Sequence, residues 1–369
     1  MRRVLLAMAA VVLAATPLPA AAADCAKTTT ALVPLTDLGT GTYKGAQGGL
    51  YPGGTNAPPQ AYAAAGRRVA AEMVPRAASG QPDPGGAIVL LSIGMSNTTQ
   101  EFSRFVTLAK TDTLRDPQVI VVDGAQGGQD ARVWSDPKAA AWGVADQRLR
   151  AAGATAAQVQ AIWLKQAMAG PRGDFASSGA ELERALDAIV LNAVARYPNL
   201  AQIFLSPRTY AGYAITTLNP EPYAYETAFV VKRLVERSVR EPSARPWIGW
   251  GPYLWTDGTK GRSDGFTWTC ADVAADGVHP SPAGQAKVAQ LLQAFFDGSE
   301  FTSWYRDAPA TVQTAAPAAT QAAAPVSPGP GAVVAPGAAA EIPPWAYAAA
   351  ALTILGAAAL TLRRTRRPS

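Results

Sequence analysis

The sequence predicts an α/β protein, a three-layer α/β/α sandwich around a mostly parallel five-stranded sheet. Five short apolar runs each end in a polar or glycine-rich loop, as buried parallel strands do. Between these runs lie segments with helical periodicity, so strand and helix alternate along the chain. Right-handed crossovers are the simplest connections for such an alternation.

The apolar runs supply the strands of this sheet. They are AIVLLSI (87–93), QVIVVD (118–123), VQAIWLK (159–165), LAQIFLS (200–206) and WIGWG (247–251). In an open α/β sheet the reactive groups lie in the loops at the carboxyl ends of the strands. The polar residues that follow each run are therefore the candidates for a functional site.

The segments between the strands supply the helices. Helical spacing and helix-favouring composition occur over 98–110, 177–197, 222–240 and 281–296. The last of these begins with Ser281 as its N-cap and with Pro282 at its first helical position. An amphipathic segment over 60–73 predicts a further helix before the first strand.

The first 23 residues indicate a secretory signal peptide, so we expect the protein to be exported. Residues 1–23 have an Arg2-Arg3 start, an apolar stretch and a small-residue end, with cleavage expected near Asp24. An alternative is lipidation of Cys25. The residue before that cysteine is Asp24 rather than a small residue, which disfavours the alternative.

The other end of the chain indicates a membrane anchor. Residues 345–362 form an uncharged 18-residue run, long enough to cross the ~30 Å hydrocarbon core as a helix. The arginine-rich tail over 363–369 favours the cytoplasmic side, which leaves the rest of the protein outside the cell membrane. The alternative is a soluble alanine-rich helix. Residues 308–344 are rich in Ala and Pro and predict a disordered linker.

Between the signal peptide and the linker, residues 24–307 have the size of one large globular domain. Six of the 32 basic residues lie in the two targeting segments, which leaves 26 basic against 27 acidic residues. The formal charge of +5 therefore does not describe the domain, and no basic face for nucleic acid is indicated.

The chain has two cysteines, Cys25 and Cys270. In an oxidising exterior compartment two cysteines pair more often than they stay free. We therefore expect a disulfide between them. It would tie the start of the mature chain to a loop just before His279, the only histidine in the sequence.

His279 lies in the segment DGVHPSPAG, three residues after Asp276. This spacing allows the carboxylate to accept a hydrogen bond from Nδ1 while Nε2 points outward, an arrangement that fixes the tautomer and stabilises an imidazolium. The alternative is that Asp276 turns the loop and His279 only packs. The sequence favours a histidine base that takes a proton from a nucleophile.

The segment IGMSNTTQEF follows the first strand and supplies a candidate nucleophile, Ser96. A serine on a tight strand-to-helix turn is exposed beside the amides of the helix N-terminus, where an oxyanion can be held. The alternative is an ordinary turn with an N-cap. The pair formed by Asp276 and His279 near the end of the domain favours the nucleophile.

The segments IGMSN and DGVHPSPAG resemble the first and last sequence blocks of the SGNH (GDSL-type) hydrolases, and the resemblance spans most of residues 85–297. It implies a flavodoxin-like sheet of the SGNH hydrolase type and a catalytic triad. The triad residues that it implies are Ser96, Asp276 and His279. Met95 stands where the family usually has Asp, which leaves the serine unaltered.

The resemblance also implies an oxyanion hole. The segment VVDGAQGGQDA resembles the family's glycine block, with Gly127 as the amide donor and Gly128 as its rival. A Gly-x-Asn-Asp block is expected after the third strand, but the sequence there has no Asn. Gln166 carries the same amide one methylene further out, and we expect it either to replace that Asn or to be an ordinary loop residue. Lys165 and Arg208 either line the same mouth, where they would meet an anionic or sugar substrate, or are solvated charges, and the sequence favours solvated charges.

Other catalytic classes fit the sequence less well. An α/β-hydrolase has a Gly-x-Ser-x-Gly elbow, whereas Thr98 stands at the second glycine position here. One histidine and two cysteines do not supply a usual zinc site, and no His-Glu-x-x-His is present. We expect no cofactor and no metal in the mechanism, although this count leaves a carboxylate-bound Mg²⁺ or Ca²⁺ open.

The sequence therefore predicts an exported, membrane-anchored serine esterase or acyl hydrolase. Its expected substrates are O-acyl esters, such as acetyl esters, of carbohydrates, or small esters and lipids. The altered third block motivates an alternative, a catalytically inactive SGNH-like surface module that binds a glycan or a protein partner. The Gly- and Pro-rich segment 48–59 is either a rim loop or a lead-in to the fold.

Overall fold

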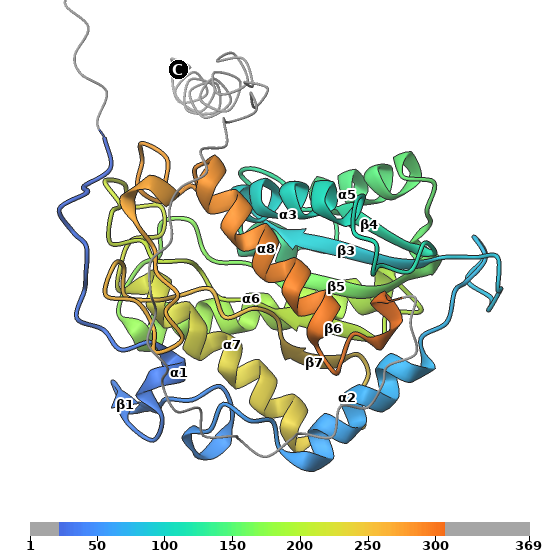
Figure 1. The fold of residues 1–369 in the computed structure, drawn as a ribbon, viewed down its shortest axis with the longest axis horizontal. Coiled ribbons are helices and arrows are strands. Elements are labelled where there is room, and N and C mark those ends of the chain that lie inside the picture. Colours follow the sequence, from blue (N-terminus) through green and yellow to red (C-terminus); the bar gives the residue numbers. More distant parts are fainter. Residues whose placement is uncertain (1–21, 307–369) are drawn as a thin grey trace, which may run out of the picture. The chain divides into compact units, whose positions relative to one another are not determined.

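A five-stranded parallel sheet lies at the centre of the protein, in a computed structural model that describes residues 22–306 (Figure 1). Its strands are β3 (Ile88–Gly94), β4 (Val119–Asp123), β5 (Val159–Lys165), β6 (Gln202–Leu205) and β7 (Trp247–Trp250). They lie in the order β4-β3-β5-β6-β7, and all neighbours are parallel. This is the flavodoxin-like order. The predicted fold class and its five strands are confirmed.

Burial along the strands follows from their place in the sheet. All seven residues of β3 and all seven of β5 are buried, because these strands have neighbours on both sides and helices over both faces. The edge strands β4 and β7 keep partly exposed residues. Complete burial thus marks the interior strands, whereas the equally apolar run of β4 is partly exposed because it lies at the edge.

Within the described residues, six helices of twelve or more residues surround the sheet. They are α2 (Gln60–Glu72), α3 (Ser96–Ala109), α5 (Ala140–Ala151), α6 (Phe175–Arg196), α7 (Tyr223–Arg240) and α8 (Pro282–Gly298). At the start of α8 the Ser281 hydroxyl accepts a hydrogen bond from the Gly284 amide, and Pro282 is the first helical residue, as predicted. Between β4 and β5 the sequence analysis missed α5 and the short α4 (Ala131–Ser135).

The helices form the two outer layers of the sandwich. The crossovers from β3 to β4 and from β4 to β5 run in opposite directions along the sheet, and right-handed connections therefore put α3 and α5 on opposite faces. The final helix α8 packs beside α3 (Figure 1). On the other face α6 packs against α7 and against α4.

Gly94, the last residue of β3, allows the turn between β3 and α3 to lie close against β5. A Cβ at this position would lie 2.3 Å from the Thr98 hydroxyl and 2.5 Å from the Lys165 carbonyl oxygen. That hydroxyl donates to the same carbonyl at 2.7 Å. Only glycine allows this turn, which brings Ser96 to the carboxyl edge of the sheet at the first residue of α3.

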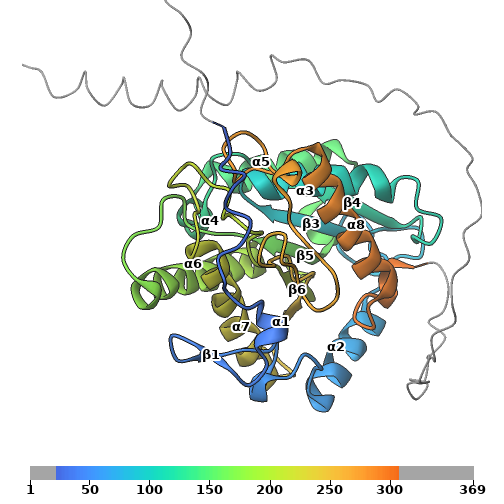
Figure 2. The same cartoon turned by 60° about the vertical axis from the view of Figure 1, so that its left-hand side comes forward.

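The start of the described chain runs across the loops at this edge (Figure 2). The Asp24 amide donates to the Tyr213 carbonyl at 2.9 Å, and the Thr30 amide donates to Asp257 at 2.6 Å. Cys25 and Cys270 form a disulfide, with their Cα atoms 5.3 Å apart, which confirms the predicted pairing.

Residues 48–59 form a lead-in to the fold that packs against the edge strand β7 and against α7. They follow the short helix α1 (Leu35–Leu38) and the hairpin of β1 (Thr42–Tyr43) and β2 (Ala46–Gln47). Trp250 of β7 donates to the Leu50 carbonyl at 2.8 Å, and Lys232 of α7 donates to the Gly48 carbonyl at 2.5 Å. These contacts support the lead-in interpretation.

Several predicted segments lie outside the described residues. They are the signal peptide up to residue 21, the linker over 308–344, the membrane span over 345–362 and the basic tail over 363–369. Within residues 22–306, none of the helices combines the length and the apolar character needed to cross a membrane.

Candidate active site

Ser96, His279 and Asp276 form one continuous chain of hydrogen bonds at the carboxyl edge of the sheet. The Ser96 hydroxyl lies 2.7 Å from Nε2 of His279, although the two residues are 183 positions apart in the sequence. Nδ1 of His279 lies 2.5 Å from Oδ2 of Asp276. The His279 and Asp276 side chains keep 26% and 28% of their surface exposed, so solvent reaches the pair. The tautomer with a proton on Nδ1 makes both contacts, and leaves Nε2 free to accept the serine proton.

Hydrogen bonds hold Asp276 in its ionised form. Burial alone would raise its pKa, but Nδ1 of His279 and the amides of His279 and Val278 donate to the carboxylate and bring that pKa down to about 2. Asp276 is therefore an anion at any pH at which a serine hydrolase would work. It orients the imidazole and stabilises the imidazolium.

The loop that carries Asp276 and His279 is fixed to α3 and to the segment after β6. Asn97, fully buried beside Ser96, donates from its side chain to the Val278 carbonyl at 2.8 Å. Gly277 has φ +71°, and a Cβ there would lie 1.9 Å from the Tyr213 carbonyl oxygen. The base and the nucleophile are thus aligned by backbone contacts as well as by their own hydrogen bond.

The first turn of α3 offers amide donors beside Ser96. The first backbone hydrogen bond of this helix runs from the Thr99 amide to the Met95 carbonyl at 3.1 Å. Among the described residues, the amides of Ser96, Asn97 and Thr98 have no backbone acceptor, as the geometry of a helix start requires. Such amides and the helix dipole favour a negative charge at this position.

The glycine loop after β4 lies against Ser96 on its other side. A Cβ built on Gly127 would be 3.9 Å from the Ser96 Cβ, whereas one on Gly128 would meet nothing within 4 Å. Of the two rivals, Gly127 is therefore the residue beside the serine. Gly128 has φ +74° and serves the turn of the loop. Donation from the Gly127 amide to an oxyanion stays a prediction.

Asp123, the last residue of β4, holds this glycine loop to α3. Its carboxylate accepts hydrogen bonds from the Ser92 hydroxyl at 2.6 Å, from the Ser103 hydroxyl at 2.9 Å and from the Thr99 hydroxyl. Burial raises the pKa of Asp123, and the three hydroxyl donors oppose that rise. The loop is tied further by the Gln126 amide, which donates to the Gly94 carbonyl at 3.0 Å.

Gln166 follows β5 directly and is only 3% exposed. Its side-chain amide donates to the Gln129 carbonyl at 3.0 Å, and its oxygen accepts from the Ala167 amide at 3.1 Å. Gln166 thus braces the glycine loop from the side of β5. One N–H of its amide group is left for another acceptor, and its predicted role at an oxyanion stays a prediction.

Lys165 and Arg208 are not solvated charges, and here the sequence analysis was wrong. Lys165 is fully buried and lies 2.5–2.6 Å from both carboxylate oxygens of Glu101, which is also fully buried. Arg208 is 1% exposed. The strand ends that carry these residues are covered by the loops of the carboxyl edge, which leaves both cations inside the protein.

The sequence analysis also missed two residues of α3 that support the site, Asn97 and Glu101. Both are fully buried and polar. They lie one and five positions after Ser96, on the same face of the helix. Two polar residues at this spacing on an otherwise apolar helix face are the sequence signal by which they could have been found.

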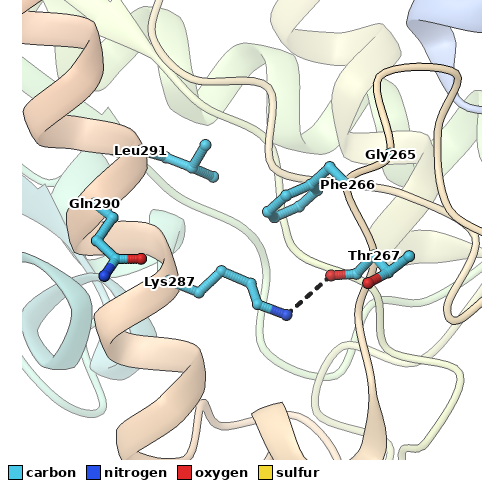
Figure 3. Close-up of a pocket in the computed structure, with 6 residues that line it drawn as sticks. All are labelled: Gly265, Phe266, Thr267, Lys287, Gln290 and Leu291. Carbon is cyan, nitrogen blue, oxygen red and sulfur yellow. Dashed lines mark hydrogen bonds between the residues drawn. The ribbon is translucent and has the colours of Figure 1, made fainter. Parts of the chain in front are cut away.

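Within residues 22–306, no group of three or more His, Cys, Asp and Glu side chains is arranged to hold a metal ion. A hollow of about 370 Å³ lies between Phe266, in the loop before α8, and Leu291 of α8 (Figure 3). None of the triad residues lines it. Lys287, at its edge, donates to the Thr267 carbonyl at 3.0 Å and to Asp272 at 2.6 Å. The lysine is thus already paired within the protein.

No protein-family model and no curated protein matches the chain by sequence. Among solved structures, the chain is similar to the salicylyl-acyltransferase SsfX3 from a tetracycline biosynthetic pathway, with TM-score 0.32 and 14% identity over 58% of this chain. The match spans 56% of that enzyme's chain, little more than half its length. It is also similar to an extracellular lipase from Streptomyces rimosus, with TM-score 0.31 and 12% identity, over 57% of this chain and 100% of the lipase. At this distance the roles of the site residues rest on the geometry described above.

The depressed pKa of Asp276 predicts an acid-dependent contribution to stability. Its value of about 2 lies below the unfolded value of about 3.9. The ionised carboxylate therefore stabilises the fold above about pH 4, and that contribution is lost as the pH falls towards 2. We expect Asp276→Asn to lower the free energy of unfolding by on the order of 2 kcal/mol at neutral pH. Urea denaturation between pH 2 and 7 measures this, and a difference that stays constant over the range would contradict it.

Proposed function

We propose that this protein is a serine esterase or acyl hydrolase with Ser96 as nucleophile, His279 as general base and Asp276 as the group that orients the base. The observation that supports this is the chain of hydrogen bonds from the Ser96 hydroxyl through both nitrogens of His279 to Asp276. The serine end of this chain of hydrogen bonds lies at the first residue of α3, where negative charge is favoured. A structural histidine needs no serine at its outward nitrogen.

In the acylation step Ser96 Oγ attacks the ester carbonyl carbon, and its proton moves to Nε2 of His279. Asp276 stabilises the imidazolium that forms. The carbonyl oxygen becomes an oxyanion, for which the amides of Ser96 and Gly127 are the candidate donors. The tetrahedral intermediate then collapses, the alcohol leaves with the proton from His279, and the acyl group stays on Ser96.

Deacylation repeats these steps with water. His279 takes a proton from a water molecule that attacks the acyl carbon, and it returns the proton to Ser96 Oγ as the acid is released. Because one imidazole handles every proton, the mechanism asks for no further titrating residue. It also asks for no cofactor.

The proposed substrates are O-acyl esters of carbohydrates, acetyl esters among them, or small esters and lipids. We further propose that the protein works outside the cell membrane, held by its C-terminal segment. That location is the reason to favour acyl groups on envelope or environmental polysaccharides. The inactive binding module remains the second candidate, because the third strand lacks the expected Asn and Gln166 already donates to Gln129.

The proposed location predicts the result of protease treatment of intact cells. Protease should cut within residues 308–344 and release the folded domain into the medium, because the linker lies outside. Release is measured by immunoblotting for the domain. If the domain stays protected until the cells are lysed, the proposed topology is wrong.

The proposed chemistry predicts that Ser96→Ala abolishes ester hydrolysis and that His279→Ala lowers kcat at least ~10³-fold. Both are measured with a short-chain chromogenic ester, and with acetylated sugars by release of acetate. Ser177→Ala is a matched control, because Ser177 also lies in the first turn of a helix but bonds to Asp174 rather than to an imidazole.

The same assay separates the two candidate functions. Full activity in the Ser177→Ala control together with loss in Ser96→Ala supports the esterase. If the folded wild-type protein hydrolyses no ester in a screen of acetylated sugars and of acyl chain lengths, the binding module is favoured. A His279→Ala variant that keeps a tenth or more of the wild-type activity would show that another group is the base.

A further inference from the structure

Arg208 is a buried cation without a partner. Its side chain is 1% exposed, and within the described residues neither Nε nor Nη1 has a hydrogen-bond acceptor. No carboxylate among those residues forms an ion pair with it, whereas the neighbouring buried cation Lys165 is fully paired with Glu101. An unpaired charge inside a protein is costly. A buried group of this kind therefore calls for a functional explanation.

The position of Arg208 puts it at the same edge of the sheet as the triad. Gly94 pairs with Lys165 on β5, and Leu205 of β6 pairs with Leu164 beside it. Neighbouring strands are about 4.8 Å apart, so the ends of β3 and β6 lie about 10 Å apart along the carboxyl edge. Ser96 and Arg208 each follow these ends by a few residues.

The segment that begins with Arg208 also forms the support under the Asp276 loop. The Ile215 amide donates to the Asp276 carbonyl at 3.1 Å, and the Tyr213 carbonyl lies against Gly277. At the start of the segment, the Arg208 amide donates to the Thr227 hydroxyl of α7 at 3.0 Å. The segment that begins with Arg208 thus connects α7 with the loop of the proposed base.

The charges around Arg208 leave Asp276 as its counter-charge. Burial lowers the pKa of the Arg208 guanidinium, and four groups oppose this by favouring its charged form: Glu101, Tyr223, Asp276 and Glu221. The Glu101–Lys165 pair has no net charge, whichever of the two holds the proton. Burial raises the pKa of Tyr223, which stays neutral.

Glu221 is the other carboxyl group of this set, and it is neutral for part of the time. Burial raises its pKa to about 7. Its oxygens are occupied by donors from the Ala211 amide, the Tyr225 amide and the Trp255 indole, at 2.8–2.9 Å. Of the four groups that act on Arg208, only Asp276 is both permanently ionised and without another formal cation beside it. This holds while His279 is neutral.

We propose that Arg208 is a positioning residue of the proposed triad. Its buried positive charge opposes protonation of His279. The imidazole is thereby kept neutral and ready to accept the Ser96 proton. This inference rests on the proposed function for its catalytic meaning, but the electrostatic coupling between Arg208 and the imidazole exists whether or not the protein is an enzyme.

The physical reason is that like charges repel strongly where water is excluded. An imidazolium at His279 would add a second cation near Arg208, and the low local dielectric makes that repulsion larger than at the surface. Asp276 acts in the opposite direction, through direct contact with His279. Loss of the Arg208 charge removes the repulsion and leaves the attraction, so protonation of the imidazole becomes easier.

The test is a titration of the only imidazole in the chain. His279 is the sole histidine in the sequence, so its ring protons give one unambiguous set of NMR signals. The variants are Arg208→Met, which removes the charge, and Arg208→Lys, which keeps it. Lys232→Met is the matched control, because it removes another buried cation, one whose contacts are with Glu236 and the Gly48 carbonyl rather than with the site.

We expect the midpoint of the imidazole titration to move up by about half to one pH unit in Arg208→Met. Arg208→Lys and Lys232→Met should keep the wild-type midpoint. An unmoved midpoint in folded Arg208→Met overturns the proposal. If Arg208→Met does not fold, Arg208→Lys provides the test. This variant keeps the positive charge, so a rise of its midpoint by about half a pH unit or more would also overturn the proposal.

Kinetics then connect the coupling with catalysis. The ratio of kcat/KM between wild type and Arg208→Met should fall about two- to sevenfold between pH 6 and pH 8.5, because an imidazole of ordinary pKa is deprotonated at the higher pH even after a shift of half to one unit. A purely structural role predicts the same ratio at every pH. A shifted midpoint in a protein without esterase activity would refute the proposed function and leave the coupling intact.

Discussion

The hydrogen bond between Ser96 and His279 is the constraint on which the site depends. It joins residues 183 positions apart at 2.7 Å, so the first strand-to-helix turn and the last loop of the domain must be placed together. Gly94 lets α3 start against β5, and Asn97 ties α3 to the loop that carries the base. The disulfide at Cys270 and the segment after β6 hold that loop from its other side.

The fold follows from the sequence to the extent that local signals are strong. Short, mainly apolar runs such as VQAIWLK become strands of the sheet, and those in its interior are buried on both faces. The two helices missed between β4 and β5 lack such a signal. α5 is an alanine-rich segment with a glycine and has little contrast between its faces, and α4 has only five residues. They are stabilised by contacts of Trp134 and Trp142 with the core, which only the tertiary structure provides.

The site divides in the same way. Ser96, Asp276 and His279 lie in short motifs with local spacing, and the folded chain brings them together as the sequence suggested. The surroundings could not be read locally. Lys165 and Arg208 are charged residues, for which exposure is the usual state. Lys165 is buried with Glu101, which comes from a different part of the chain, and Arg208 is buried without an ion-pair partner among the described residues. A buried cation near the triad is therefore a property of the fold rather than of any motif.

The central claim is that Ser96 is a nucleophile activated by His279. Labelling with a fluorophosphonate, followed by mass spectrometry of the peptides, tests it most directly because the reagent traps an activated serine without any assumption about the substrate. The account predicts a single adduct on the peptide that contains Ser96, and no adduct in His279→Ala. An adduct on another serine, or unmodified protein that still hydrolyses esters, would contradict it.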